Sequence, residues 1–230
     1  MDNLEFEKQY KNWGLEAQRQ YPNEAFVRFM AEHYFSLPLS KRKKTRILEI
    51  GCGSGANLWV ISRERFDAYG VDIAPTSIGL CKKMLTTYGA KAQLSVGNMK
   101  MLTFRNNVFE AIVDVMTIEH TDLQGHRETF SEIFRCLKKG GRFFSWHLGS
   151  KSVSFTKGKG KRIDALTVDN IPNTTVPYHS SGLTCFITPA VLQKLLRKAG
   201  FKDIKIERIT RTYKNMKQEM EYFAIDARKP

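Results

Sequence analysis

Three alternate glycines stand between an apolar run and an expected helix in the stretch ILEIGCGSGANL: Gly51, Gly53 and Gly55. A strand that passes through such a loop into a helix lets the backbone approach a ligand closely. Asp72 follows at the expected tip of the next strand, where a carboxylate can accept both hydroxyls of a ribose. The loop and this carboxylate together predict a nucleoside-binding site at the carboxyl edge of a sheet.

The spacing of the glycines in the loop indicates which kind of nucleoside it binds. Dinucleotide-binding folds use GxGxxG, whereas the third glycine here comes one residue early, and the GxxxxGK of a P-loop is absent. Glu49, two residues before Gly51, would repel a pyrophosphate but could attract a ligand with a positive tail. This pattern favours S-adenosylmethionine as the ligand of the loop.

Five segments resemble, in order and spacing, the successive motifs of the class I S-adenosylmethionine-dependent methyltransferases: ILEIGCGSG, GVDIAP, VGNMKMLTF, VFEAIVDVMTIEH and LKKGGRFF. The resemblance covers roughly residues 45–148 and is closest to the small-molecule branch, since no nucleic-acid module and no NPPY-type base-methylation signature is present. It implies S-adenosylmethionine as the cofactor and methyl transfer as the activity.

The resemblance also implies a role for each matching residue. The methionine part of the cofactor would be held by Glu49 and by the loop residues Gly51, Cys52, Gly53 and Gly55. The ribose hydroxyls would bind Asp72, and the adenine would contact Ile73, Asn98 and Met99. Asp114, at the end of the fourth strand, stands where the family lines the methionine and methyl-transfer site.

Four of these residues have structural alternatives. Glu49 could be a surface carboxylate that faces a helix, although its apolar neighbours indicate a buried strand. Asp72 could cap the next turn, and Asn98 could be a turn residue after Gly97. Asp114 could be a hydrogen-bonded strand end with only backbone contact to the cofactor. The family commonly has Asp at the position of Asn98, and Asn still offers a hydrogen-bond acceptor.

Histidines are the candidates for a general base. Methyl transfer is an in-line displacement in which the enzyme chiefly supplies alignment, and a base is needed only if the acceptor must lose a proton. His147 is expected at the end of the fifth strand, facing the mouth of the site. His120 belongs to an EH pair after the fourth strand, and His179 lies in the long segment 149–187. Each could instead be structural.

An N-terminal helix and the segment 149–187 are expected to cover the site. Tyr10 and Trp13 lie on an apolar stripe of an N-terminal helix that either packs in the core or closes the site, and Tyr178 belongs to the segment 149–187. In some quinone-pathway relatives a metal-binding acidic residue precedes the EH pair. Met116 stands at that place here, so no metal is expected.

Strands that alternate with helices are expected to position these residues. The strands of this alternation are predicted at 46–50, 68–72, 92–96, 110–115 and 142–147, and its helices at 56–65, 76–88 and 124–138. A helix at 189–199 and two strands, 204–209 and 219–226, follow without a helix between the last two. This order predicts an α/β fold with a doubly wound, Rossmann-like sheet. The resemblance implies seven strands with an antiparallel final hairpin.

The domain organisation follows from the same pattern. Residues 1–44 are expected to form a helical cap, with Asn23 as an N-cap, and a solvated linker that contains KRKK. Residues 45–230 are expected to form the methyltransferase domain. Its aperiodic stretch 149–187, an insertion after the fifth strand, is expected to be a mobile substrate lid.

Composition and charge bound the remaining possibilities. The acidic N-terminus excludes a secretory signal, no apolar run suits a membrane helix, and four scattered cysteines suit a reducing cytoplasm. The net charge of +14 keeps an RNA methyltransferase open as an alternative. A non-catalytic binding protein of the same fold is a second alternative. GKGKR in the insertion favours an acidic or phosphorylated small-molecule acceptor.

Overall fold

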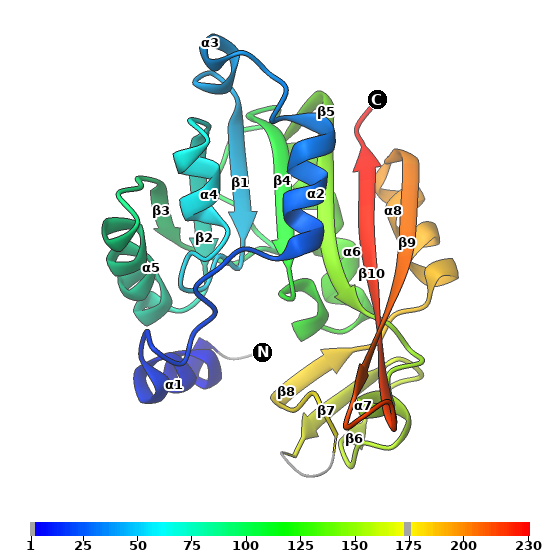
Figure 1. Ribbon diagram of the computed structural model, residues 1–230. Helices are drawn as coiled ribbons and strands as arrows, with labels where there is room; N and C mark the ends of the chain where they lie inside the picture. The colour runs from blue at the N-terminus through cyan, green and yellow to red at the C-terminus, as the bar shows by residue number, and fades with distance from the viewer. Residues whose placement is uncertain (1–2, 173–175) are drawn as a thin grey trace.

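The main sheet has seven strands within residues 3–172 and 176–230, the part of the chain that this computed structural model describes. Their order is β3-β2-β1-β4-β5-β10-β9 (Figure 1). The first five strands run parallel: β1 (Arg46–Ile50), β2 (Asp67–Asp72), β3 (Gln93–Val96), β4 (Phe109–Val115) and β5 (Leu137–Leu148). The hairpin of β9 (Lys202–Tyr213) and β10 (Gln218–Arg228) pairs antiparallel with β5. The predicted doubly wound α/β fold is confirmed.

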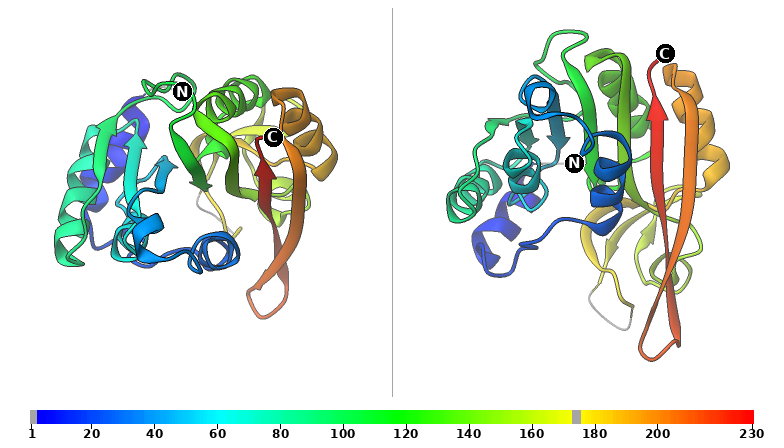
Figure 2. Two further views of the ribbon diagram at one scale, coloured as in Figure 1. Left: turned by 90° about the horizontal axis from the view of Figure 1, so that it is seen from above. Right: turned by 45° about the horizontal axis from the view of Figure 1, so that its top comes forward.

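Helices pack on both faces of this sheet (Figures 1 and 2). One apolar cluster joins the sheet to α2 (Glu24–His33), α4 (Leu58–Arg63) and α5 (Pro75–Thr87). A second cluster, on the opposite face, joins it to α6 (Leu123–Cys136) and α8 (Pro189–Ala199). Strands between two such layers are buried on both faces, which explains the nearly continuous apolar run of β1.

Capping residues mark the ends of α2 and α8. Asn23 caps α2, because its side chain accepts the N–H of Phe26 at 3.2 Å. Thr188 caps α8 in the same way, and Gly200 ends that helix in the left-handed conformation with φ +107°. α1 (Asn3–Trp13) precedes α2, and the expected linker contains a short helix, α3 (Leu39–Arg42).

The boundary between α6 and β5 differs from the prediction. The helix was expected to continue to Lys138 and to stop at Gly140 and Gly141. It ends at Cys136 instead, because Leu137 already pairs with Phe109 of β4. A register shift then accommodates the residues before the regular part of β5.

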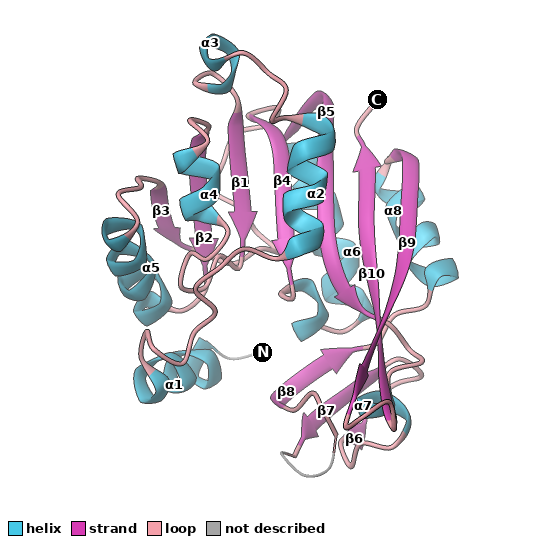
Figure 3. Cartoon of the chain, viewed as in Figure 1, coloured by secondary structure: helices cyan, strands magenta, loops and turns pink. Residues whose placement is uncertain are grey.

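The segment 149–187 contains more regular structure than its sequence indicated (Figure 3). It forms α7 (Val153–Thr156) and a small antiparallel sheet of β6 (Lys161–Arg162), β7 (Thr167–Ile171) and β8 (Ser180–Cys185). Residues 173–175 of the expected lid lie outside the described residues. The described helices include none that is both long enough and apolar enough to cross a membrane.

Candidate active site

A cavity of about 230 Å³ lies where β1, β2 and β4 end. Its walls come from α1, the glycine loop, the strand ends and the 3-10 helix η1 (Ile118–His120). Ten of the residues expected at the site line it: Tyr10, Glu49, Gly51, Cys52, Gly53, Asp72, Ile73, Asn98, Met99 and His120. The carboxyl ends of parallel strands share one edge of a sheet, and this geometry gathers residues that are far apart in the sequence.

The glycine loop has a backbone that other residues would strain. Gly51, Gly53 and Gly55 all have positive φ, at +58°, +51° and +92°. A Cβ on Gly51 would lie 2.1 Å from Cγ2 of Thr117, and one on Gly53 would lie 3.0 Å from the Tyr10 hydroxyl. A Cβ on Gly55 would lie 2.6 Å from Sγ of Cys81 in α5. Gly55 therefore serves close packing on α5, and it does not line the cavity.

Asp72 is held at the edge of the cavity by two backbone groups. Its Oδ2 accepts the N–H of Gly53 and its Oδ1 the N–H of Ala74, both at 2.9 Å. Burial raises the pKa of this carboxyl, and the two hydrogen bonds lower it in part. The side chain is 7 % exposed, and each oxygen keeps a lone pair for a ligand in the cavity.

Glu49 brings a buried carboxyl with one free oxygen to the same cavity. Its Oε1 accepts Nδ2 of Asn57 at 2.5 Å, whereas its Oε2 has no hydrogen-bond partner among the described residues. Burial raises the pKa of Glu49 to about 8, although Asn57 and the charge of Arg19 lower it in part. An unpaired buried oxygen of this kind suits a cationic ligand group.

Arg19 is the cation of this site that the sequence analysis missed. It lines the cavity, and its Nη1 donates to Oδ1 of Asn57 at 3.1 Å. The backbone N–H of Asn23 donates to the same oxygen at 3.0 Å. Asn57 thus links the cap of α2 to Glu49. Arg19 places a positive charge in the cavity lining, where it could bind an anionic group of a ligand. Arg19 lies in an irregular segment between two helices, where no spacing signals a function.

The far end of the cavity carries the residues expected near adenine. Ile73, Asn98 and Met99 line it together with Val71. Oδ1 of Asn98 already accepts the N–H of Lys100 at 2.9 Å, as in an Asx turn. The predicted acceptor of Asn98 therefore fixes the local turn, and its second lone pair and its amide N–H groups remain for a base.

Comparisons with known proteins agree with this geometry. A family described as "Methyltransferase domain" matches residues 47–141, which hold the glycine loop, Asp72 and Asn98. This match supports, over residues 47–141, the resemblance to the class I S-adenosylmethionine-dependent methyltransferases. Their cofactor fits the charges found here, because its methionine part carries an ammonium group for Glu49 and a carboxylate for Arg19.

Two curated proteins match this chain at less than 30 % identity. O-methyltransferase 3 of Dictyostelium discoideum is 23 % identical over 194 residues, which are 80 % of this chain and 42 % of the relative. Sterol 24-C-methyltransferase of Neurospora crassa is 28 % identical over 137 residues, 56 % of this chain and 35 % of the relative. The chain thus spans about two fifths or less of the length of these two relatives.

Solved structures share the methyltransferase fold. A S-adenosylmethionine-dependent methyltransferase from Methanosarcina mazei superposes with a TM-score of 0.63 at 19 % identity, over 84 % of this chain and 97 % of that one. Phosphoethanolamine N-methyltransferase 2 of Haemonchus contortus gives 0.63 at 16 % identity, over 90 % of this chain and 52 % of that one. At these identities the likeness shows the fold alone.

Two of the three predicted histidines, His147 and His179, do not line the cavity. His147 is fully buried and does not line the cavity; its Nε2 lies 2.9 Å from Nε2 of His126 in α6. The expectation that it faces the mouth of the site is wrong, because its side chain points to the sheet face that α6 covers. His179 is exposed and also lies outside the cavity lining.

His120 is the one predicted histidine that lines the cavity. Its ring meets Phe6 of α1 edge to face, with 5.1 Å between the centroids. Burial lowers the pKa of His120 to about 4, so the imidazole is neutral near pH 7. A neutral imidazole there can accept a hydrogen bond from a methyl acceptor, but with this pKa it is a weak base near pH 7.

Two further expected residues are structural rather than exposed to the cavity. Oδ1 of Asp114 accepts the N–H groups of Thr117 and Ile118, and its Oδ2 accepts the hydroxyl of Ser145 at 2.6 Å. Its side chain does not line the cavity, contrary to the expectation from the family. Tyr178 is also absent from the lining and packs edge to face on Phe186 within the insertion.

The N-terminal helix roofs the cavity through one of its two aromatic residues. Tyr10 lines the cavity above Gly53, whereas Trp13 is 53 % exposed and points away. Glu7 of α1 accepts the N–H of Thr76 at the start of α5 at 3.0 Å. Gln9 donates to Oγ of Ser181 in the insertion at 2.5 Å. α1 therefore bridges the cofactor side of the domain and the insertion.

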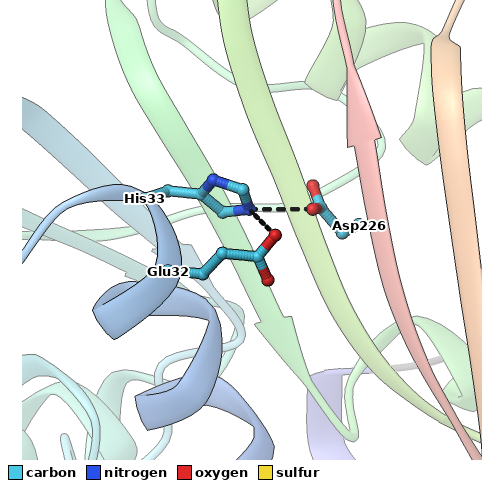
Figure 4. Close-up of side chains that lie close together, drawn as sticks. All are labelled: Glu32, His33 and Asp226. Carbon is cyan, nitrogen blue, oxygen red and sulfur yellow. Dashed lines mark hydrogen bonds and ion pairs between the residues drawn. The ribbon is translucent and has the colours of Figure 1, made fainter.

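A second cluster of polar side chains lies away from this cavity, between α2 and β10 (Figure 4). Glu32, His33 and Asp226 have the spacing of metal ligands, with Nε2 of His33 2.9 Å from Oδ2 of Asp226. Cationic side chains already occupy the carboxylates: Arg142 donates twice to Asp226, and Lys205 pairs with Glu32 at 2.9 Å. This ion-pair network ties α2 to the sheet, and we assign no metal to it.

The ionisation of Glu49 predicts how cofactor binding depends on pH. Its pKa in the cofactor-free protein is about 8, so the carboxyl must lose a proton to pair with the cofactor's ammonium group. Affinity for S-adenosylhomocysteine should therefore rise with pH between about 6 and 8, by up to about tenfold per unit, and then level off. Calorimetry across this range would measure the slope. Glu49→Gln should flatten it, whereas an unchanged slope in that variant would contradict the assignment.

Proposed function

We propose that the protein transfers the methyl group of S-adenosylmethionine to a small-molecule acceptor. The pairing of a fixed Asp72 with an unpaired oxygen of Glu49 in one cavity carries this proposal. Asp72 would bind the ribose hydroxyls, Glu49 the ammonium group and Arg19 the carboxylate of the methionine part. Adenine would lie against Ile73 and Met99.

The cofactor supplies an electrophilic methyl group when it is bound, and the protein supplies binding, orientation and exclusion of water. Tyr10 and Phe6 of α1 would keep water from the cavity they line. His120 would accept a hydrogen bond from a hydroxyl group of the acceptor, since its imidazole is neutral, but its pKa of about 4 makes it a weak base near pH 7. The mobility of residues 149–187 as a lid over the acceptor stays a prediction.

The charged residues that line the cavity indicate whether it favours a phosphorylated acceptor. The expectation of an acidic or phosphorylated acceptor came from the basic segment GKGKR, residues 158–162. This segment contributes nothing to the cavity lining, and its three cationic side chains are exposed. The lining contains two cations, Arg19 and Lys100, and two carboxylates, Glu49 and Asp72. The site therefore offers no excess of positive charge to a phosphorylated acceptor.

Methyl-labelled S-adenosylmethionine tests the proposal. The protein, incubated with the labelled cofactor and either a small-molecule extract or RNA, is expected to label a small molecule that mass spectrometry can identify. Transfer to RNA that falls steeply with salt would support the RNA methyltransferase instead. Labelling of neither pool, with cofactor bound, would favour the non-catalytic alternative.

A further inference from the structure

Glu119 is a buried carboxyl without a hydrogen-bond partner beside the cavity. It is 0 % exposed, and neither of its side-chain oxygens has a partner among the described residues. Leaving a buried polar group unpaired is costly, and more so for a charged one. The next two residues, His120 and Thr121, line the cavity. A ligand that donates hydrogen bonds to both oxygens would remove this cost.

The surroundings of Glu119 are aromatic. Burial raises the pKa of Tyr178 and that of Tyr222, and the nearby carboxyl of Glu119 adds to both shifts. Tyr222 stacks on Trp146 with 5.1 Å between the ring centroids. Arg211 already lies over both of these rings, 5.6 Å from the centroid of Trp146 and 5.9 Å from that of Tyr222. A carboxylate accepts N–H groups, so Glu119 itself favours an amine over a carboxylate or a phosphate.

No protein cation among the described residues compensates this carboxyl. Burial and the neighbouring Asp114 raise the pKa of Glu119 well above its ordinary value, and no Lys or Arg contributes in the opposite direction. His120 is neutral, because burial lowers its pKa to about 4. A positive group on a ligand would therefore meet a carboxyl that has no hydrogen-bond partner among the described residues.

We propose that Glu119 binds the methyl acceptor and that the acceptor presents an amine nitrogen to it. This inference rests on the proposed methyl transfer. An amine that enters as the ammonium ion would first pass a proton to Glu119, because burial makes this carboxyl more basic. The nitrogen lone pair then forms the new bond to the methyl carbon, the carbon–sulfur bond breaks with its electron pair on sulfur, and the positive charge moves to nitrogen. The Glu119 oxygen without the proton accepts an N–H group of that nitrogen and stabilises the charge as it develops.

Access to Glu119 requires the insertion to move. β8 packs against η1, and Tyr178 belongs to the same segment of the chain. With these elements in place, Glu119 has no contact with solvent. The amine would therefore enter while the insertion is displaced and would be enclosed when it returns.

Matched acceptors and one isosteric variant test this proposal. We would test two series of acceptors at saturating cofactor, each with an amine, an alcohol and a carboxylate. The aromatic series is phenethylamine, phenethyl alcohol and phenylpropionate, and the aliphatic series is propylamine, propanol and propionate. Thermal stabilisation in the presence of S-adenosylhomocysteine would report binding, and methyl-labelled S-adenosylmethionine would report transfer. We expect a response to the amines alone. Glu119→Gln should lower kcat/KM for the amine by at least about 100-fold, chiefly through KM, because it removes the charge and one acceptor.

The controls separate this role from the rest of the protein. Glu219→Gln, at an exposed position of β10, should leave the amine response unchanged. Glu119→Gln should keep the affinity for S-adenosylhomocysteine and the melting temperature. The role of Glu119 would be overturned if the wild type responded to the amines no more than to the alcohols and carboxylates, or not at all. It would also be overturned if Glu119→Gln kept the wild-type response to the amines. Failure of the wild type to bind the cofactor would instead count against the proposed function.

Discussion

Replacing Asp72 by Ala should weaken the binding of S-adenosylhomocysteine by at least about 100-fold. The substitution removes two charge-assisted hydrogen bonds to the ribose, each worth about 1.5–3 kcal/mol. It also frees the N–H groups of Gly53 and Ala74, which Asp72 now fixes at 2.9 Å. Isothermal titration calorimetry would measure the affinity, and thermal unfolding would show that the variant still folds.

The same strand supplies a matched control for Asp72. Asp67 begins β2 at the opposite edge of the sheet, where it is paired with Arg46 at 3.5 Å. Asp67→Ala removes a carboxylate from the same strand and should leave cofactor affinity unchanged. Equal affinity of Asp72→Ala and the wild type would show that the ribose is not bound at Asp72.

Replacing Gly51 by Ala should damage both the fold and cofactor binding. The residue has φ +58°, which costs an L-residue about 1–2 kcal/mol, and the new methyl group would lie 2.1 Å from Cγ2 of Thr117. With the cost of overpacking, the free energy of unfolding should fall by about 3 kcal/mol or more. Urea unfolding would measure the loss, and calorimetry would show weaker cofactor binding because the loop must shift.

Gly79 offers the comparison within α5. A Cβ there would meet nothing within 4 Å, and the residue has no positive φ. Gly79→Ala should therefore be neutral or stabilise the protein by about 0.5–1 kcal/mol, as Ala does in a helix. If Gly51→Ala had the same free energy of unfolding and the same cofactor affinity as Gly79→Ala, the loop would not need a glycine at position 51.

The cofactor half of the site could be predicted because its residues follow one another at strand ends. Glu49, Gly51 and Asp72 are placed by β1, β2 and the loop between them, and parallel strands bring their carboxyl ends to one edge. Arg19 could not be found in this way. It reaches the site through the hydrogen bonds of Asn57, which are a tertiary feature of the folded chain.

The placement of His147 failed for a different physical reason. β5 is buried on both faces, so its sequence shows no alternation that tells which side chains face which layer. Phe144 and Trp146 face the α2 side, whereas His147 faces α6 and pairs with His126. The strands of the insertion were missed because β6 and β7 are short and lie in a Ser- and Lys-rich segment.

A crystal structure of the protein with S-adenosylhomocysteine would decide the cofactor assignment. We expect the ribose hydroxyls within hydrogen-bond distance of Asp72, the ammonium group at Oε2 of Glu49 and the adenine between Ile73 and Met99. Tyr10 should cover the ligand from α1. A ligand bound elsewhere, or one in this cavity with its ribose away from Asp72, would contradict the site described above.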